Sequence, residues 1–234
     1  MSPQRVPNEL SPREAWAQLR SGNDRFVAGT PAHPSQNADR RRELRAAQHP
    51  HTVIFGCSDS RVAAEIIFDQ GLGDVFVVRT AGHVVDTTVI GSIEYGVDLL
   101  GAALVVVLGH DSCGAVAAAA HTLATGEQPG GFVRAVVDRV IPSIASITSG
   151  DPDLAMAALA DQSVLRREHV KHTVGMLHGY SAGLAQAVAE GRCAVVGLEY
   201  DLDVGSARMV NVIGDIGELP PVPQEAAQEA AQEA

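Results

Sequence analysis

The sequence predicts an α/β fold: a mostly parallel central β-sheet of four to five strands flanked by helices, with an N-terminal helical arm over about residues 10–30. Short apolar runs rich in β-branched residues occur at 52–56, 75–79 and 103–109, as is typical of buried parallel strands. Segments with helical periodicity separate these runs. Strands that alternate with helices favour a parallel sheet covered by helices on its faces.

Local signals place the remaining elements. A helix-start pattern at Ser11 opens the arm, which Gly22 and Asn23 are expected to interrupt. Pro142 is expected to kink or break its helix. Further helices are expected over residues 40–47, 63–68, 87–100, 113–124, 132–147, 153–177 and 181–190, and a final strand hairpin over 194–199 and 207–212.

Composition narrows the class of protein. The 234 residues are 46% hydrophobic and 19% charged, which is typical of a soluble globular domain. A net charge of −11 argues against nucleic acid or an anionic membrane as a partner. The sequence holds no apolar stretch of membrane-spanning length and no signal-peptide core, so we expect no membrane segment and a cytoplasmic location. We expect one domain over 1–219 and a disordered Pro/Ala/Glu/Gln tail over 220–234.

The chemistry-bearing residues follow two of the expected strands. Cys57 follows the strand over 52–56, and His110 and Cys113 follow the strand over 103–109. Open α/β sheets place their sites at the carboxyl ends of strands. Two thiols and one imidazole suit zinc and leave a fourth position for water. The alternatives are two buried cysteines beside an unrelated histidine, and a closed structural site with Asp59 as fourth ligand.

The third cysteine and the adjoining carboxylate have separate interpretations. An odd count of three cysteines suits a disulfide framework poorly, and Cys193 in a strand-like run is expected to be a buried apolar residue. Asp59 can either bind the metal or pair with Arg61. In the paired state the open coordination position holds water, whose pKa zinc lowers toward neutrality. The alternative is an ordinary local ion pair.

The segments CSDSR at 57–61 and HDSCG at 110–114 resemble the C-x-D-x-R and H-x-x-C pattern of the β-class carbonic anhydrases. The similarity also includes FVVRTAG, SIEYGV and the region after Glu199, so it covers most of residues 10–215. Either motif alone would be weak, whereas the pair at this separation is specific.

The resemblance implies a function and a set of residues. Cys57, His110 and Cys113 would bind Zn²⁺, and Asp59 and Arg61 would form the catalytic dyad, with Asp59 as a possible fourth ligand in a closed state. Asp59 would accept a hydrogen bond from zinc-bound water or hydroxide. The implied reaction is the reversible hydration of carbon dioxide to bicarbonate and a proton, by attack of zinc-bound hydroxide on CO2.

In the plant-like branch of the family, a glutamine at the position of Gln48 donates to substrate in a neighbouring subunit. Phe76 and Ala81 fall where that branch lines an apolar CO2 pocket, which suits a small substrate without a dipole. A loop glutamine and plain core packing are the alternatives. Ile54 stands where the other branch has a tryptophan near an inhibitory bicarbonate site, which favours the plant-like, open-site branch.

The resemblance also implies a homodimer or homotetramer in which N-terminal helices embrace the partner. Trp16, Leu19 and Phe26 at helical spacing fit such an arm, and they also fit packing within the chain. His83 and His51 are candidates for a proton shuttle, with a surface or structural role as the alternative for each. A further histidine cluster on a polar helical stretch is expected to face solvent: His169, His172 and His178.

Three rival functions remain open from the sequence. A CS2 or COS hydrolase on the same scaffold would share the ligands and differ in access to the pocket. A non-catalytic zinc- or bicarbonate-binding regulator would keep Asp59 on the metal, and the intact Asp59–Arg61 pair argues against it. A metal-free thiol enzyme that uses Cys57 would leave His110 and Cys113 unexplained.

Overall fold

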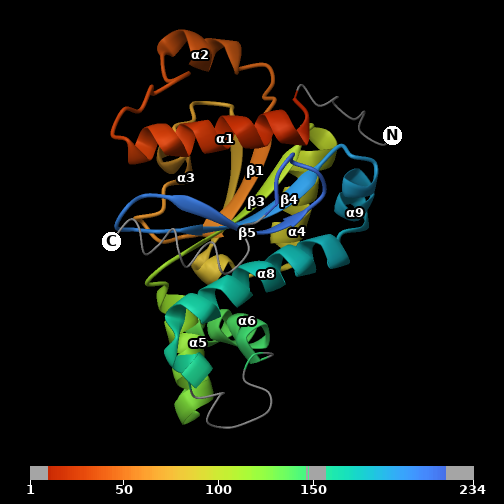
Figure 1. The fold of residues 1–234 in the computed structure, drawn as a ribbon. Helices are drawn as coiled ribbons and strands as arrows, with labels where there is room; N and C mark the ends of the chain where they lie inside the picture. Colours follow the sequence, from red (N-terminus) through yellow and green to blue (C-terminus); the bar gives the residue numbers. More distant parts are fainter. Residues whose placement is uncertain (1–9, 146, 148–156, 220–234) are drawn as a thin grey trace.

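Five strands form one sheet in the order β2-β1-β3-β4-β5 (Figure 1). The structure, a computed structural model, describes residues 10–145, 147 and 157–219. Strands β1, β2, β3 and β4 are parallel, whereas β5 runs antiparallel to β4. The bounds are Thr52–Cys57 for β1, Val75–Thr80 for β2, Leu104–His110 for β3, Ala194–Tyr200 for β4 and Ala207–Ile213 for β5. The predicted mostly parallel sheet is confirmed.

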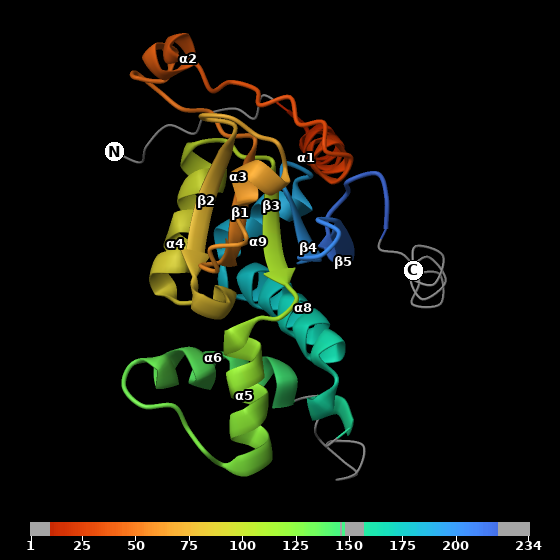
Figure 2. The same ribbon diagram turned by 90° about the vertical axis from the view of Figure 1, so that its left-hand side faces the viewer.

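Helices cover both faces of this sheet, so β1, β3 and β4 are buried along their whole length. Figure 2 shows α1 and α4 on opposite sides of the strands. Side chains alternate between the faces, as the strand period requires: Ile54 packs toward α1 and Phe55 toward the other face. One face carries α1 (Pro12–Val27) and α3 (Ala64–Ile67); the other carries α4 (Thr87–Glu94), the π-turn η2 (Tyr95–Leu99), α8 (Gln162–Tyr180) and α9 (Ala182–Ala189).

A third apolar cluster closes the carboxyl end of the sheet. Helices α5 (Gly114–Thr125) and α6 (Val133–Ala145) lie beyond the end of β3, as Figure 2 shows. Their apolar side chains pack with the start of α8 around Cys57 and Cys113. The carboxyl ends of the central strands are therefore enclosed by protein instead of opening directly into solvent.

The expected interruption of the first helix at Gly22 and Asn23 is wrong, because α1 continues unbroken to Val27. A Cβ on Gly22 would lie 1.8 Å from the carbonyl oxygen of Phe68, so glycine allows the helix to approach that backbone. The buried Asn23 amide donates to the carbonyl oxygens of Ile67 and Gly205. Both residues therefore make contacts between α1 and the segments around Phe68 and Gly205.

Other boundaries differ from expectation for local reasons. The polar helix expected over 40–47 is α2 (Ala38–Glu43), which Asn37 caps by accepting the Arg40 N–H. Pro142 lies inside α6 and does not end it. The helix expected over 153–177 is divided: residues 157–160 are helical, and α8 begins after the Asp161 cap. Residues 148–156 lie outside the described part of the chain.

The N-terminal helix packs on its own sheet, as the packing interpretation of Trp16 and Leu19 expects, and its embrace of a partner stays a prediction. Both side chains belong to the core beneath α1 within the chain. The tail over 220–234 lies outside the described residues. Among the residues that are described, no helix has the length and apolar character needed to cross a membrane.

Candidate metal centre

Two neighbouring strands bring the predicted ligands together. Cys57 is the last residue of β1, His110 is the last residue of β3, and Cys113 is the N-cap of α5. Strands β1 and β3 are paired in register, with Gly56 opposite Leu108, so their ends lie at the same edge. The ligand atoms of Cys57, His110 and Cys113 all lie within 4.8 Å of one another, and all three residues are buried.

The His110 ring is oriented for binding an ion. Its Nδ1 lies 2.6 Å from the carbonyl oxygen of Asp111. A carbonyl can only accept, so Nδ1 carries the proton and Nε2 keeps its lone pair. Nε2 is buried and has no hydrogen-bond partner within the described part of the chain. A metal would satisfy this nitrogen, and the backbone bond at the other ring nitrogen is the usual support for a metal-binding histidine.

The two sulfurs share one proton in the metal-free chain. A hydrogen bond from the Cys113 thiol lowers the pKa of Cys57 to about 4. The same interaction, together with burial, raises the pKa of Cys113. A divalent cation would favour the thiolate form of both residues and displace that proton. The donor set of two sulfurs and one orphaned imidazole nitrogen therefore fits zinc.

Asp59 lies outside this cluster of ligand atoms and is paired with Arg61. Arg61 Nε donates to Oδ1 at 3.0 Å and Nη2 donates to Oδ2 at 2.7 Å. These bonds hold the pKa of Asp59 well below its usual range, so the carboxylate is ionised. The predicted Asp59–Arg61 pair is therefore present. In this arrangement Asp59 does not occupy the fourth coordination position of a bound metal.

Arg79 is a residue that the sequence reasoning missed. Its Nε donates to the carbonyl oxygen of Cys57 at 2.9 Å, and its Nη2 donates to that of Asp59 at 2.6 Å. It therefore clamps the turn that carries both residues. Arg79 lies opposite Gly56 in the strand register. The sequence did contain a signal for this role, because Arg79 is a cation at the end of an apolar strand that pairs with the Cys57 strand.

The short turn η1 (Ala81–His83) lies against the cluster. The Gly82 N–H donates to the Cys57 Sγ at 3.3 Å. Ala81, predicted to line a substrate pocket, belongs to this turn and so lies beside the candidate centre.

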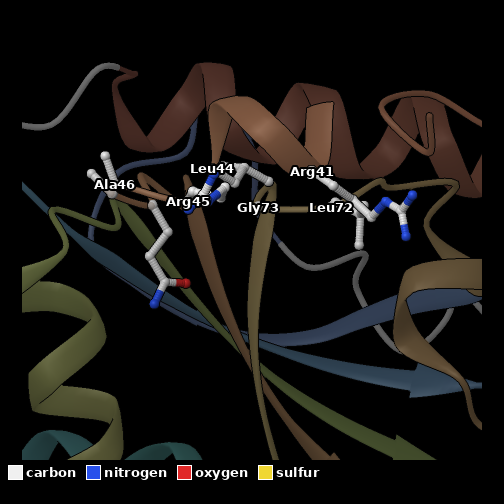
Figure 3. Close-up of a pocket in the computed structure, with 8 residues that line it drawn as sticks. Arg41, Leu44, Arg45, Ala46, Leu72 and Gly73 are labelled. Atoms are coloured by element: carbon white, nitrogen blue, oxygen red, sulfur yellow. The ribbon is translucent and has the colours of Figure 1, made fainter. Parts of the chain in front are cut away.

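Gln48 and Phe76 lie at the other end of the sheet. Phe76 pairs with Val53, four residues before Cys57, which corresponds to about 13 Å along the strand. Gln48 precedes β1 and lines a hollow of about 480 Å³ with Arg41 and Arg45 (Figure 3). A single chain does not bring these two residues to its own cluster, so their predicted role requires a second subunit.

The histidines outside the cluster occupy two kinds of position. His51 precedes β1, at the end of the sheet away from Cys57, and bonds Gln70. His83 is buried, and neither of its ring nitrogens has a partner among the described residues. Solvent exposure was the wrong expectation for His169, which is 2% exposed. Its nitrogens contact Gly82 and Ser143.

The fold and this cluster define an α/β protein with a candidate metal centre at the carboxyl edge of a parallel sheet. A family model described as carbonic anhydrase matches residues 52–207. The chain is 53% identical to Carbonic anhydrase 2 of Mycobacterium tuberculosis over 213 residues, which cover 91% of this chain and 99% of that protein. It is 52% identical to a carbonic anhydrase of Mycolicibacterium smegmatis over 214 residues, which cover 92% of this chain and 100% of that protein.

The fold comparison agrees with the sequence comparison. One of two tetrameric β-carbonic anhydrases of Sordaria macrospora matches with a TM-score of 0.60 and 23% identity, over 84% of this chain and 96% of that chain. This chain belongs to the carbonic anhydrase family of enzymes, and it has the β-class fold. The resemblance carried by the segments at 57–61 and 110–114 is confirmed.

Proposed function

We propose that the chain catalyses the reversible hydration of carbon dioxide to bicarbonate and a proton, with Zn²⁺ held by Cys57, His110 and Cys113. The observation that supports this most strongly is the convergence of the three ligand atoms within 4.8 Å, where His110 Nε2 is buried without a partner. The identity to carbonic anhydrases over nine tenths of the chain supports the choice of reaction.

Zinc at this position would supply a Lewis acid that lowers the pKa of water toward neutrality, an effect for which carbonic anhydrase is itself the standard example. The chain's own residues would then orient the reacting groups. Asp59 is ionised and can only accept hydrogen bonds. It would accept the proton of the attacking hydroxide in a hydrogen bond and so leave an oxygen lone pair facing CO2. Arg61 would keep that carboxylate off the metal, and Arg79 would fix the turn that carries Cys57 and Asp59.

We further propose that the active form is a homodimer or homotetramer in which Gln48 and Phe76 of one copy complete the substrate pocket of another. Both residues lie toward the amino ends of the strands, and Phe76 packs beside the partly exposed Tyr95. Ala81 would contribute from the copy that holds the zinc. Ile54 stands where the other branch of the family has a tryptophan, which supports the plant-like, open-site branch.

Stopped-flow hydration of CO2 with a pH indicator tests the reaction directly. We expect zinc-loaded protein to accelerate hydration and a metal-free preparation to be inactive. The rival CS2 or COS hydrolase predicts turnover of those substrates with little CO2 hydration. A non-catalytic regulator predicts one zinc per chain, no turnover of any of the three, and Asp59 on the metal.

Light scattering of the purified chain tests the proposed assembly. We expect a mass of two or four chains. A monomer with full activity would remove Gln48 and Phe76 of a second copy from the pocket.

A further inference from the structure

His169 is a buried polar residue that no step of the proposed reaction uses. It lies on α8, and its Nε2 is 2.8 Å from the carbonyl oxygen of Gly82. Its Nδ1 is 2.8 Å from the Ser143 hydroxyl on α6. The ring of His83 packs against it, with the ring centroids 4.2 Å apart. Contacts from η1 and α6 thus hold this imidazole in place.

The Gly82 carbonyl fixes which nitrogen carries the proton. A carbonyl can only accept, so His169 Nε2 donates to Gly82. Burial lowers the pKa of His169 to about 4, so the ring is neutral near pH 7 and Nδ1 is an acceptor. The Ser143 hydroxyl has one proton and two acceptors within reach: Nδ1 at 2.8 Å and the carbonyl oxygen of Val140 at 2.6 Å. The donor therefore points at Gly82 in one defined tautomer.

Gly82 connects this imidazole to the candidate metal centre. Its N–H donates to the Cys57 Sγ at 3.3 Å, and its φ of 63° lies in the left-handed region. Glycine has two soft dihedral angles and no Cβ, so its N–H direction is weakly defined by the residue itself. A fixed carbonyl on the same residue restricts those angles and keeps the N–H directed at sulfur.

We propose that His169 is a positioning residue for the metal site: it anchors the Gly82 carbonyl and so holds the Gly82 N–H on the Cys57 sulfur. This inference rests on the proposed zinc site. A hydrogen bond to a ligating sulfur orients the ligand and tunes its donation to the metal, as outer-shell partners generally do. Loss of the anchor should loosen the zinc without removing any ligand.

The competing interpretation is that His169 only packs α8 against η1. A variant at Val174 on the same helix distinguishes the two interpretations. Val174 is fully buried in the core, and its side chain lies against Gly197 and not Gly82. V174A lowers stability by leaving a cavity and keeps the His169 donor in place. It is the matched control for loss of packing.

Two measurements on the full chain test the proposal: the rate of zinc release to a chelator and the thiolate-to-metal absorption band of the Co²⁺-substituted protein. We expect H169F, which has no donor, to release zinc about 10-fold to 100-fold faster than wild type and to shift the cobalt band. H169Q places an amide N–H at the position of Nε2 and should restore both values. V174A should match wild type in both.

A second pair of variants covers the case in which H169F does not fold. H169N keeps a polar side chain that is one atom too short to reach Gly82, so it should release zinc faster than H169Q. The proposal is overturned if H169F or H169N behaves as wild type, or if V174A releases zinc as fast as they do. If wild type itself takes up no zinc or cobalt, the proposed function fails instead.

Discussion

Asp59 and Arg61 form a two-pronged ion pair at the edge of the candidate zinc site. Arg61 Nε and Nη2 donate to separate oxygens of the Asp59 carboxylate, and the Arg61 backbone N–H adds a third bond at 2.9 Å. The guanidinium is about half exposed, whereas the carboxylate is mostly covered. The carboxylate is thereby held ionised and turned toward arginine beside the ligands.

Removal of this carboxylate should separate catalysis from metal binding. D59A is expected to keep one zinc per chain and to lose about 100-fold or more of kcat/KM, because a positioned acid–base group contributes on that order. Stopped-flow CO2 hydration with parallel elemental analysis checks both. D215A removes an aspartate from a surface pair with Arg13 and is the control. Full activity in D59A would remove Asp59 from the mechanism.

The three ligands should be individually required for the metal. C57S and H110A are expected to lose zinc and activity together, because a thiolate or an imidazole is lost from a three-residue set. Elemental analysis of dialysed protein gives the stoichiometry, with one zinc per chain for wild type. C193A is the matched control, since Cys193 is buried in the core beside α9. Retention of zinc by C57S or H110A would show that the metal binds elsewhere.

Gly82 should be sensitive to a single added methyl group. In G82A the new Cβ would lie 2.6 Å from the Ala115 Cβ, at a φ that alanine rarely adopts. We expect a loss of about 1–3 kcal/mol in the free energy of unfolding, together with weaker zinc binding. Denaturant titration and chelator competition measure the two effects. G91A, on an exposed helical face with open space around it, should be neutral or stabilising.

Acid should destabilise the fold through the buried histidines. Burial lowers the pKa of His169 from 6.5 to about 4, so the unfolded chain binds this proton more readily than the folded chain. Stability is therefore full above about pH 6.5 and falls as the pH drops toward 4. Burial also lowers the pKa of His83, which acts in the same direction.

A comparison of variants isolates the contribution of His169. Between pH 7 and about pH 5, wild type should lose about 2 kcal/mol more unfolding free energy than H169Q, which cannot take up this proton. V174A should keep the wild-type pH dependence. Equal losses in wild type and H169Q would mean that His169 is charged, or freely hydrated, in the folded chain.

The sequence was most informative where chemistry and strand pattern coincide. Cys57 and His110 each end a run of buried strand residues, so the shared edge of the sheet could be inferred before any contact was known. The interruption predicted at Gly22 and Asn23 was wrong because the residues that they contact, Phe68 and Gly205, are distant in the chain. Local sequence rules predict that Gly-Asn breaks a helix. In the fold, Gly22 lets the helix approach the Phe68 backbone and the buried Asn23 amide donates to distant carbonyl oxygens.

His169 shows the same limit at the site itself. It lies among polar residues on α8, and its Gly82 partner is 87 residues away. Periodicity therefore predicted a solvent-facing ring, whereas the fold places it behind the Cys57 turn. The predicted roles of Gln48 and Phe76 depend on a second copy, so neither the sequence pattern nor one chain's geometry decides them.

Zinc K-edge X-ray absorption of the purified wild-type chain tests the proposed centre most directly. The convergence of Cys57, His110 and Cys113 predicts two sulfurs at about 2.3 Å, one imidazole nitrogen at about 2.0–2.1 Å and one further oxygen. A first shell without sulfur, or with four sulfurs, would contradict it.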